Sequence, residues 1–160
     1  MSLTKITLAK ALKIKNLLIK KINDSKCLIM RHNSYDTRNP PDFDIQQEYI
    51  NLFGYTEQLA KLKAQITVAN AAIADKLYSQ AEYRSLIATI SSIPTEHGVI
   101  EVENHMYGSP ARTVTKEAII TEKVIKLATD GLSAKINKLQ DEIDAFNALT
   151  TIEVPTSFIV

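Results

Sequence analysis

The stretch that decides the fold is LSAKINKLQDEIDAF, residues 132–146. Its apolar residues recur at steps of four, three, four and three, and they are Leu132, Ile136, Leu139, Ile143 and Phe146. Because a helix completes a turn about every 3.6 residues, this spacing places all five on one side of a helix that packs along another helix. The pattern predicts one helix from Thr121 to about Ala148, running through Asp130-Gly131 without a break.

Similar spacing predicts two more long helices. The first runs from Thr4 or Thr7 to Arg31, and a loop around Asn39-Pro40-Pro41 follows, because proline removes a backbone donor and restricts the residue before it. The second runs from Asp44 over about 30 residues, a length taken from its apolar spacing. Asp44 is the expected N-cap, with Gln47 reaching back as in a capping box.

The remaining segments predict one short helix and one projecting arm. Ser79-Gln80-Ala81-Glu82 resembles a capping box, and Pro94 ends the short helix. Residues 95–120 contain β-branched residues on either side of a turn signal at 107–110, which predicts a β-hairpin or extended arm. The sequence therefore predicts a mainly α fold over residues 1–160: a single domain with an antiparallel, coiled-coil-like helical bundle, the 95–120 arm and a C-terminal tail at 150–160.

Length and composition exclude several classes of protein. The chain has 160 residues, 45% apolar and 23% charged, as a soluble domain does. No apolar run approaches the roughly 18 residues that a membrane span needs. Lysines interrupt every apolar stretch near the start, so we expect no cleaved secretory signal and a cytoplasmic or virion location. The single cysteine, Cys27, fits a reducing compartment.

Charge is distributed unevenly along the chain. Residues 1–31 have a net charge of +7, which leaves −6 for the rest of a chain whose total is +1. The basic face of the first helix includes Lys10, Lys13, Lys20 and Lys21. These lysines are either the solvated outer side of a bundle helix or a surface for nucleic acid or an anionic membrane. The first interpretation is favoured, because no aromatic residue is interleaved with the lysines.

One segment of the arm contains potential metal ligands. Residues two apart in a strand share a face, so Glu101, Glu103 and His105 would present two carboxylates and an imidazole together. A solvated polar face is the alternative interpretation. A metal-dependent enzyme is accordingly the second alternative for function, after a nucleic-acid- or membrane-surface-binding module.

No other motif indicates catalysis or a cofactor. The four glycines form neither a phosphate-binding loop nor a dinucleotide fingerprint. His32 lies near Ser34 and Asp36 but without the turn that presents a nucleophile. We therefore expect a protein that is not an enzyme and needs no cofactor or metal.

Apolar residues in the tail and the arm are the best interaction signals. An apolar chain end normally frays unless it docks, either on its own domain or on a neighbour. The candidate interaction residues are Phe158, Ile159, Val160, Val99, Ile100, Val102 and Tyr107.

Several stretches resemble the DIP1984 family, small helical proteins some of whose members are labelled septicolysin-like. The similar stretches are Leu8-Ala9-Lys10-Ala11-Leu12, Ile66-Thr67-Val68-Ala69-Asn70, and Leu139 to Ile143 leading to Asn147 and 150–154. The family pattern has a glycine turn where this chain has Asp75-Lys76-Leu77. The family pattern also lacks an arm and a tail as long as those of this chain. The resemblance implies a helical fold and no established activity.

Together these features predict a non-enzymatic structural or assembly subunit. It would contact neighbouring chains through its helical faces, the 95–120 arm and the tail, and a bacteriophage virion is one setting for it. The expected partners are proteins, either further copies of this chain or a larger assembly.

Overall fold

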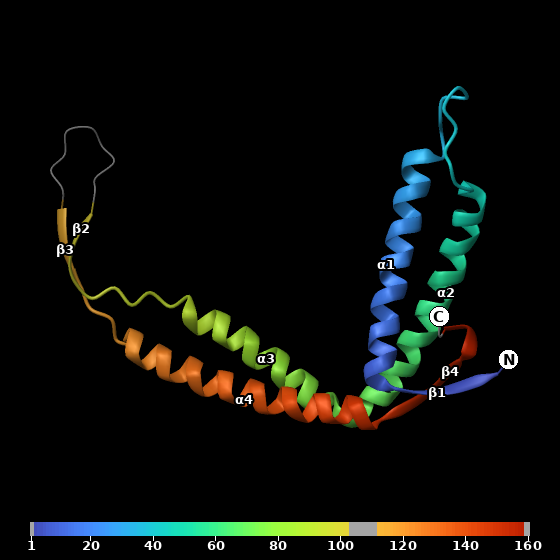
Figure 1. Ribbon diagram of the computed structural model, residues 1–160. Coiled ribbons are helices and arrows are strands. Elements are labelled where there is room, and N and C mark those ends of the chain that lie inside the picture. The colour runs from blue at the N-terminus through green and yellow to red at the C-terminus, as the bar shows by residue number, and fades with distance from the viewer. Residues whose placement is uncertain (1, 103–111, 159–160) are drawn as a thin grey trace. The chain divides into compact units, whose positions relative to one another are not determined.

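The computed structural model describes residues 2–102 and 112–158, with side chains described for 2–100 and 113–158 (Figure 1). The chain is mainly α-helical, as the sequence predicts, and it contains two small antiparallel sheets. It divides into two compact units. The first contains Met1–Ala74 and Glu142–Val160, and the second contains Asp75–Asp141.

A two-stranded sheet joins distant parts of the first unit. Strand β1 (Leu3–Thr7) pairs antiparallel with β4 (Thr151–Pro155), with Ile6 opposite Ile152. Every second side chain points inward, so Ile6, Ile152 and Val154 are buried. On the outer side Lys5 lies opposite Glu153 in an exposed ion pair of 4.0 Å, a type of contact that adds little stability.

The first helix begins later than one of the two starts predicted for it. Helix α1 spans Leu8–His32, and Thr7 is its N-cap, accepting a hydrogen bond from the Lys10 N–H at 3.2 Å. Thr4 lies in β1, so a start at Thr4 is wrong. The N–H of Leu8 donates to the carbonyl of Thr150 at 2.8 Å, which satisfies one of the unpaired donors at a helix start.

Helix α2 spans Ile45–Asn70 and runs beside α1 in the first unit (Figure 1). Asp44 is the N-cap as predicted, accepting from the Gln47 N–H at 3.0 Å. The Gln47 side chain donates to Asn51 instead. Among the described residues, its predicted hydrogen bond back to the cap is absent. A buried polar contact also joins the two helices, because Ser25 of α1 donates to the Glu48 carboxylate at 2.6 Å.

The core of the first unit lies where these two helices meet the sheet. Leu8, Leu62 and Val154 are fully buried there, one each from α1, α2 and β4. Their neighbours in the cluster are Ile6, Ala11, Leu18, Ile66, Ile152 and Phe158. Burial of apolar side chains from five elements of the chain is the main force that holds this unit together.

The helix after α2 begins earlier than predicted. A 3-10 turn at Ala71–Ile73 leads directly into α3 (Ala74–Ser91), so Ser79 lies inside the helix and is not its cap. The capping-box pattern is wrong here because no non-helical residue separates α2 from α3. A short hydroxyl followed by an acid three residues later is also compatible with a helix interior.

The second unit pairs α3 with the first part of α4 (Glu122–Leu149), which is continuous through Gly131 as predicted. Gln80 of α3 is buried, and its Nε2 donates to Gln140 Oε1 at 2.9 Å. The ammonium of Lys135 lies 5.8 Å from the centre of the Tyr83 ring. Leu132, Ile136 and Leu139 of the predicted apolar stripe are half-buried in this unit.

The arm forms the predicted hairpin. Strand β2 (Gly98–Val102) pairs antiparallel with β3 (Arg112–Lys116), with Ile100 opposite Val114. Gly98 has a φ of 106°, a conformation that favours glycine. Lys116 forms an ion pair with Glu96 just before the hairpin.

Candidate interaction surface

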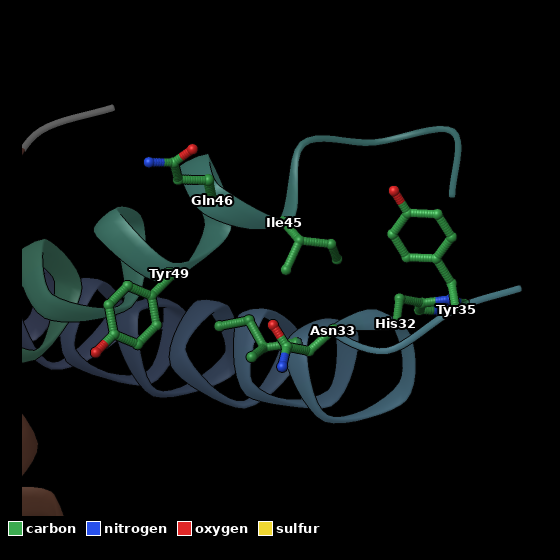
Figure 2. Close-up of a pocket in the computed structure, with 7 residues that line it drawn as sticks. His32, Asn33, Tyr35, Ile45, Gln46 and Tyr49 are labelled. Atoms are coloured by element: carbon green, nitrogen blue, oxygen red, sulfur yellow. The ribbon is translucent and has the colours of Figure 1, made fainter. Parts of the chain in front are cut away.

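A pocket of about 400 Å³ lies at the end of the α1–α2 pair, next to the connecting loop (Figure 2). Ile29 and His32 of α1, Asn33 and Tyr35 of the loop, and Ile45, Gln46 and Tyr49 of α2 line it. In Figure 2 the Ile45 side chain projects from α2 towards α1, whereas the Gln46 side chain projects away. The pocket mixes apolar walls with imidazole, amide and phenol groups, a composition suited to binding a side chain of another protein.

Aromatic side chains gather around this pocket. The rings of His32 and Phe43 meet edge to face at 5.0 Å, and the rings of Tyr49 and Phe53 do so at the same distance. Tyr35, Phe43, Tyr49 and Phe53 are all exposed. Large aromatic rings at a protein surface are typical of interface anchors, because they bury much area at a small entropic cost.

A second pocket lies in the first unit between α2 and β4. It encloses about 530 Å³, and its walls are mainly Ala64, Gln65, Val68 and Ala69 with residues 150–153. The Gln65 Nε2 donates to the Glu153 carbonyl at 2.7 Å. Its Oε1 is buried with no hydrogen-bond partner among the described residues, which is a costly state for a polar atom.

Unprotected apolar residues also mark the second unit. Ile119 and Ile120, just before α4, and Val124 and Leu127, in its first turns, are exposed, and Ile119 is 97% exposed. Val124 and Leu127 lie three apart, so they share one side of the helix. Helix α3 has no buried apolar residue, and its Leu86 is exposed.

The predicted basic face lies on the outer side of α1. Lys10, Lys13 and Lys20 are exposed, while Lys21 is half-buried with its ammonium 5.3 Å from the centre of the Tyr55 ring. The buried residues of α1 are Leu8, Ala11, Leu18 and Ser25, on the opposite side. Lys13 and Lys20 therefore project away from the core, an arrangement that both interpretations of the basic face require, whereas Lys21 lies against α2.

The tail is covered by its own unit. Phe158 belongs to a 3-10 turn at Thr156–Phe158 and is buried in the core described above. The N–H of Thr156 also donates to the carbonyl of Ser2 at 3.0 Å. Of the two coverings that the sequence left open, its own domain is therefore the one observed for Phe158. Ile159 and Val160 lie outside the described residues.

The arm residues are only partly described. Val99 is exposed and Ile100 is half-buried, whereas Tyr107 lies outside the described residues and Val102 is placed in β2 without its side chain. Glu101 is likewise placed in β2 by its backbone alone, and Glu103 and His105 lie outside the description. Within the described part of the chain, no three His, Cys, Asp or Glu residues form a group that could hold a metal ion.

One ion pair perturbs a titratable group in the loop before α2. The Arg38 side chain donates to both oxygens of Asp36, with Nη2 at 2.7 Å from Oδ2. These bonds, together with one from the Arg38 backbone N–H, lower the pKa of Asp36 from its ordinary value of 3.8. The same side-chain bonds raise the pKa of Arg38.

The aromatic cluster was not among the sites that the sequence predicts, although a signal was available. Five of the ten aromatic residues occur within 21 positions, and they are Tyr35, Phe43, Tyr49, Phe53 and Tyr55. Tyr49 fits the apolar spacing from which the sequence predicts this helix, but its side chain is exposed.

No family model, curated protein or solved structure matches this chain. Among the described residues, no helix is both long and apolar enough to cross a membrane.

Proposed function

We propose that this protein is a non-enzymatic structural or assembly subunit that contacts other protein chains through its exposed helical faces. The observation that supports the proposal best is the number of large apolar side chains on the surfaces of both units. Phe53 and Val68 in the first unit and Val124 and Leu127 in the second are each more than half exposed. Large apolar side chains that gather on a protein surface are typical of interaction sites.

The architecture explains why the surfaces are apolar. Two helices packed as a pair can cover only one side of each, so an apolar residue on any other side needs cover from elsewhere. In the second unit the sole buried residue with a described side chain is polar, namely Gln80. A neighbouring chain that covered α3 and α4 would supply the burial that this unit lacks.

The contact regions in this proposal differ from those that the sequence suggested. Phe158 is buried in its own unit, so the tail stabilises the fold and the helical faces make the contacts. The arm remains a proposed contact region through Val99, whose side chain is exposed. A virion is one setting for such a subunit, and the resemblance to the DIP1984 family stays a prediction that adds no activity.

The lysines of α1 support a second candidate, a surface for nucleic acid or an anionic membrane. Lys10, Lys13 and Lys20 are all exposed on one helix, where they could meet phosphates. This candidate predicts binding that falls steeply as salt rises and that is lost when Lys13 and Lys20 are changed to glutamate. Binding that ignores salt would contradict it.

The proposed assembly is tested by the solution mass of the untagged chain, measured by light scattering after size exclusion over a hundredfold range of concentration. The chain mass is 17.8 kDa, so each added copy is easily resolved. We expect a discrete multimer. A monomer at every concentration would contradict self-assembly.

A further inference from the structure

Helix α2 has apolar residues on the side that faces away from the core. Leu62 and Ile66 are buried against α1 and the sheet, whereas Tyr49, Phe53, Ala60, Ala64 and Val68 are exposed. At about 100° per residue these five lie roughly 120–220° around the helix from the buried side. We call them, together with Glu57, the outer α2 face. They span 19 positions, or roughly 28 Å at 1.5 Å per residue.

The outer α2 face has bulky residues at one end and small residues at the other. Tyr49 and Phe53 lie near the start of α2, and Val68 is 77% exposed near its end. Ala64 and Val68 also line the 530 Å³ pocket beside β4. One end of this face therefore offers protruding rings, and the other end offers a hollow with apolar walls.

We propose that a second copy of this chain packs its outer α2 face against this one in the antiparallel direction. The spacing is symmetric about a point between Gln58 and Leu59. A two-fold axis at that point places Tyr49 beside Val68 of the partner copy, Phe53 beside the partner copy's Ala64, and Glu57 beside the partner copy's Ala60. Each ring then meets a small residue or the pocket, which gives the size matching that close helix packing requires.

Charge selects the antiparallel direction. In a parallel pair Glu57 would face Glu57 and the alanines would face alanines, leaving repulsion at one level and a gap at another. In the antiparallel pair Glu57 comes close to Lys61 of the partner copy, one position from its Ala60. The two-fold axis generates a second, identical pair of Glu57 and Lys61. Because opposite charges then lie beside each other at both places, the antiparallel orientation is favoured over the parallel one.

The unpaired Gln65 oxygen is a second observation at the same place. Gln65 lines the pocket, and its Oε1 is buried without a hydrogen-bond partner among the described residues. In the antiparallel pair the partner copy's Tyr49 enters beside Val68, one turn along the helix from Gln65. Its phenol group is a hydrogen-bond donor, the kind of group that the Gln65 oxygen lacks.

The inference rests on the proposed assembly function and names the surface that would perform it. Val68→Arg tests it, because the side chain is exposed and a longer residue there leaves the core of the unit intact. The matched control is Met30→Arg, which introduces the same side chain at an equally exposed position of α1. The measurement is the dissociation constant of the multimer from light scattering over a concentration series.

We expect Val68→Arg to raise the dissociation constant at least a hundredfold, because the substitution enters a two-fold interface twice and buries a charge each time. Met30→Arg should leave the constant within threefold. If Val68→Arg assembles like the parent, the outer α2 face is not the interface and this inference fails, although assembly itself stands. A parent chain that is monomeric throughout would overturn both the inference and the proposed function.

Direction is tested by disulfide trapping in a Cys27→Ser background. Chains with Phe53→Cys are mixed with chains with Ala64→Cys under mild oxidation. We expect the mixed disulfide, because the two positions face each other across the proposed axis. Phe53→Cys alone should give no crosslink, since the two copies of this cysteine would lie about 16 Å apart along the direction of the helices. Efficient crosslinking of Phe53→Cys alone would overturn the antiparallel arrangement.

Discussion

The two units of this chain differ in how they bury apolar side chains. Among its described residues the first buries eleven, contributed by three helices, two strands and two 3-10 turns. In the second, no apolar side chain among those described is buried, and the buried Gln80 bonds to Gln140. A core therefore formed where a sheet closes one end of a helix pair, and a helix pair without such a cover kept its apolar stripe half-exposed.

The largest effect that would sharpen this comparison comes from matched leucine truncations. Leu62 is fully buried in the first unit, whereas Leu139 is half-buried in the second. We expect Leu62→Ala to lower the free energy of unfolding by about 3–4 kcal/mol and Leu139→Ala by about 1 kcal/mol, because cavity cost grows with burial. Urea denaturation followed by circular dichroism measures both. Equal losses would contradict the difference between the units.

A somewhat smaller loss of stability is expected when Phe158 of the tail is truncated. Phe158→Ala removes a ring from the core of the first unit, and we expect a loss of about 2–3 kcal/mol. The effect falls at the low end for a buried ring because Phe158 belongs to a single turn that can adjust. Thermal unfolding measures the loss, and the solution mass of the folded variant should equal that of the parent. A changed mass with unchanged stability would mean that Phe158 contacts a neighbouring chain.

The hydrogen bond between Gln80 and Gln140 in the second unit should contribute less stability than either buried apolar side chain. Gln80→Ala leaves the half-buried Gln140 amide without this partner, and we expect a cost of about 1–2 kcal/mol. Hydrogen exchange should quicken in α3 and stay unchanged in α1. The matched control is Gln46→Ala, an exposed glutamine of α2 whose removal should leave exchange unaltered. Slower exchange in α3 would contradict the structural role of Gln80.

The smallest effect concerns the loop before α2. Because the folded pKa of Asp36 is lowered by Arg38, the pair favours the folded state above the ordinary pKa of 3.8 and loses this contribution as pH falls through the folded value. Nuclear magnetic resonance titration should find the Asp36 midpoint below 3.8, moving up in Arg38→Ala. An unmoved midpoint would show that the exposed pair has no electrostatic effect in solution.

Local signals predicted the helices well. The apolar stripe from Leu132 to Phe146 identified a helix that passes through Gly131, and Asp44 identified the start of α2. Both signals depend on residues within a few positions of one another, so they can be recognised in a single stretch of chain.

Features that depend on distant partners were harder to predict. The sequence predicts a helix over part of β1, because β4, the strand that pairs with it, lies at the other end of the chain. The capping-box pattern at Ser79 failed because the backbone was already helical. Tyr49 and Phe53 follow a helical spacing whichever side faces the core, so the packing of α1 decides which residues are exposed.

The pairing of β1 with β4 also determines when the first unit can finish folding. Ser2 and Thr156 contact each other although 154 positions separate them, so the sheet closes a very long loop. At roughly 5–20 residues per second, a ribosome needs on the order of 10–30 s between making β1 and making β4. During that interval Ile6 and Leu8 have no sheet to cover them, and the nascent α1–α2 pair is the species that a chaperone would meet.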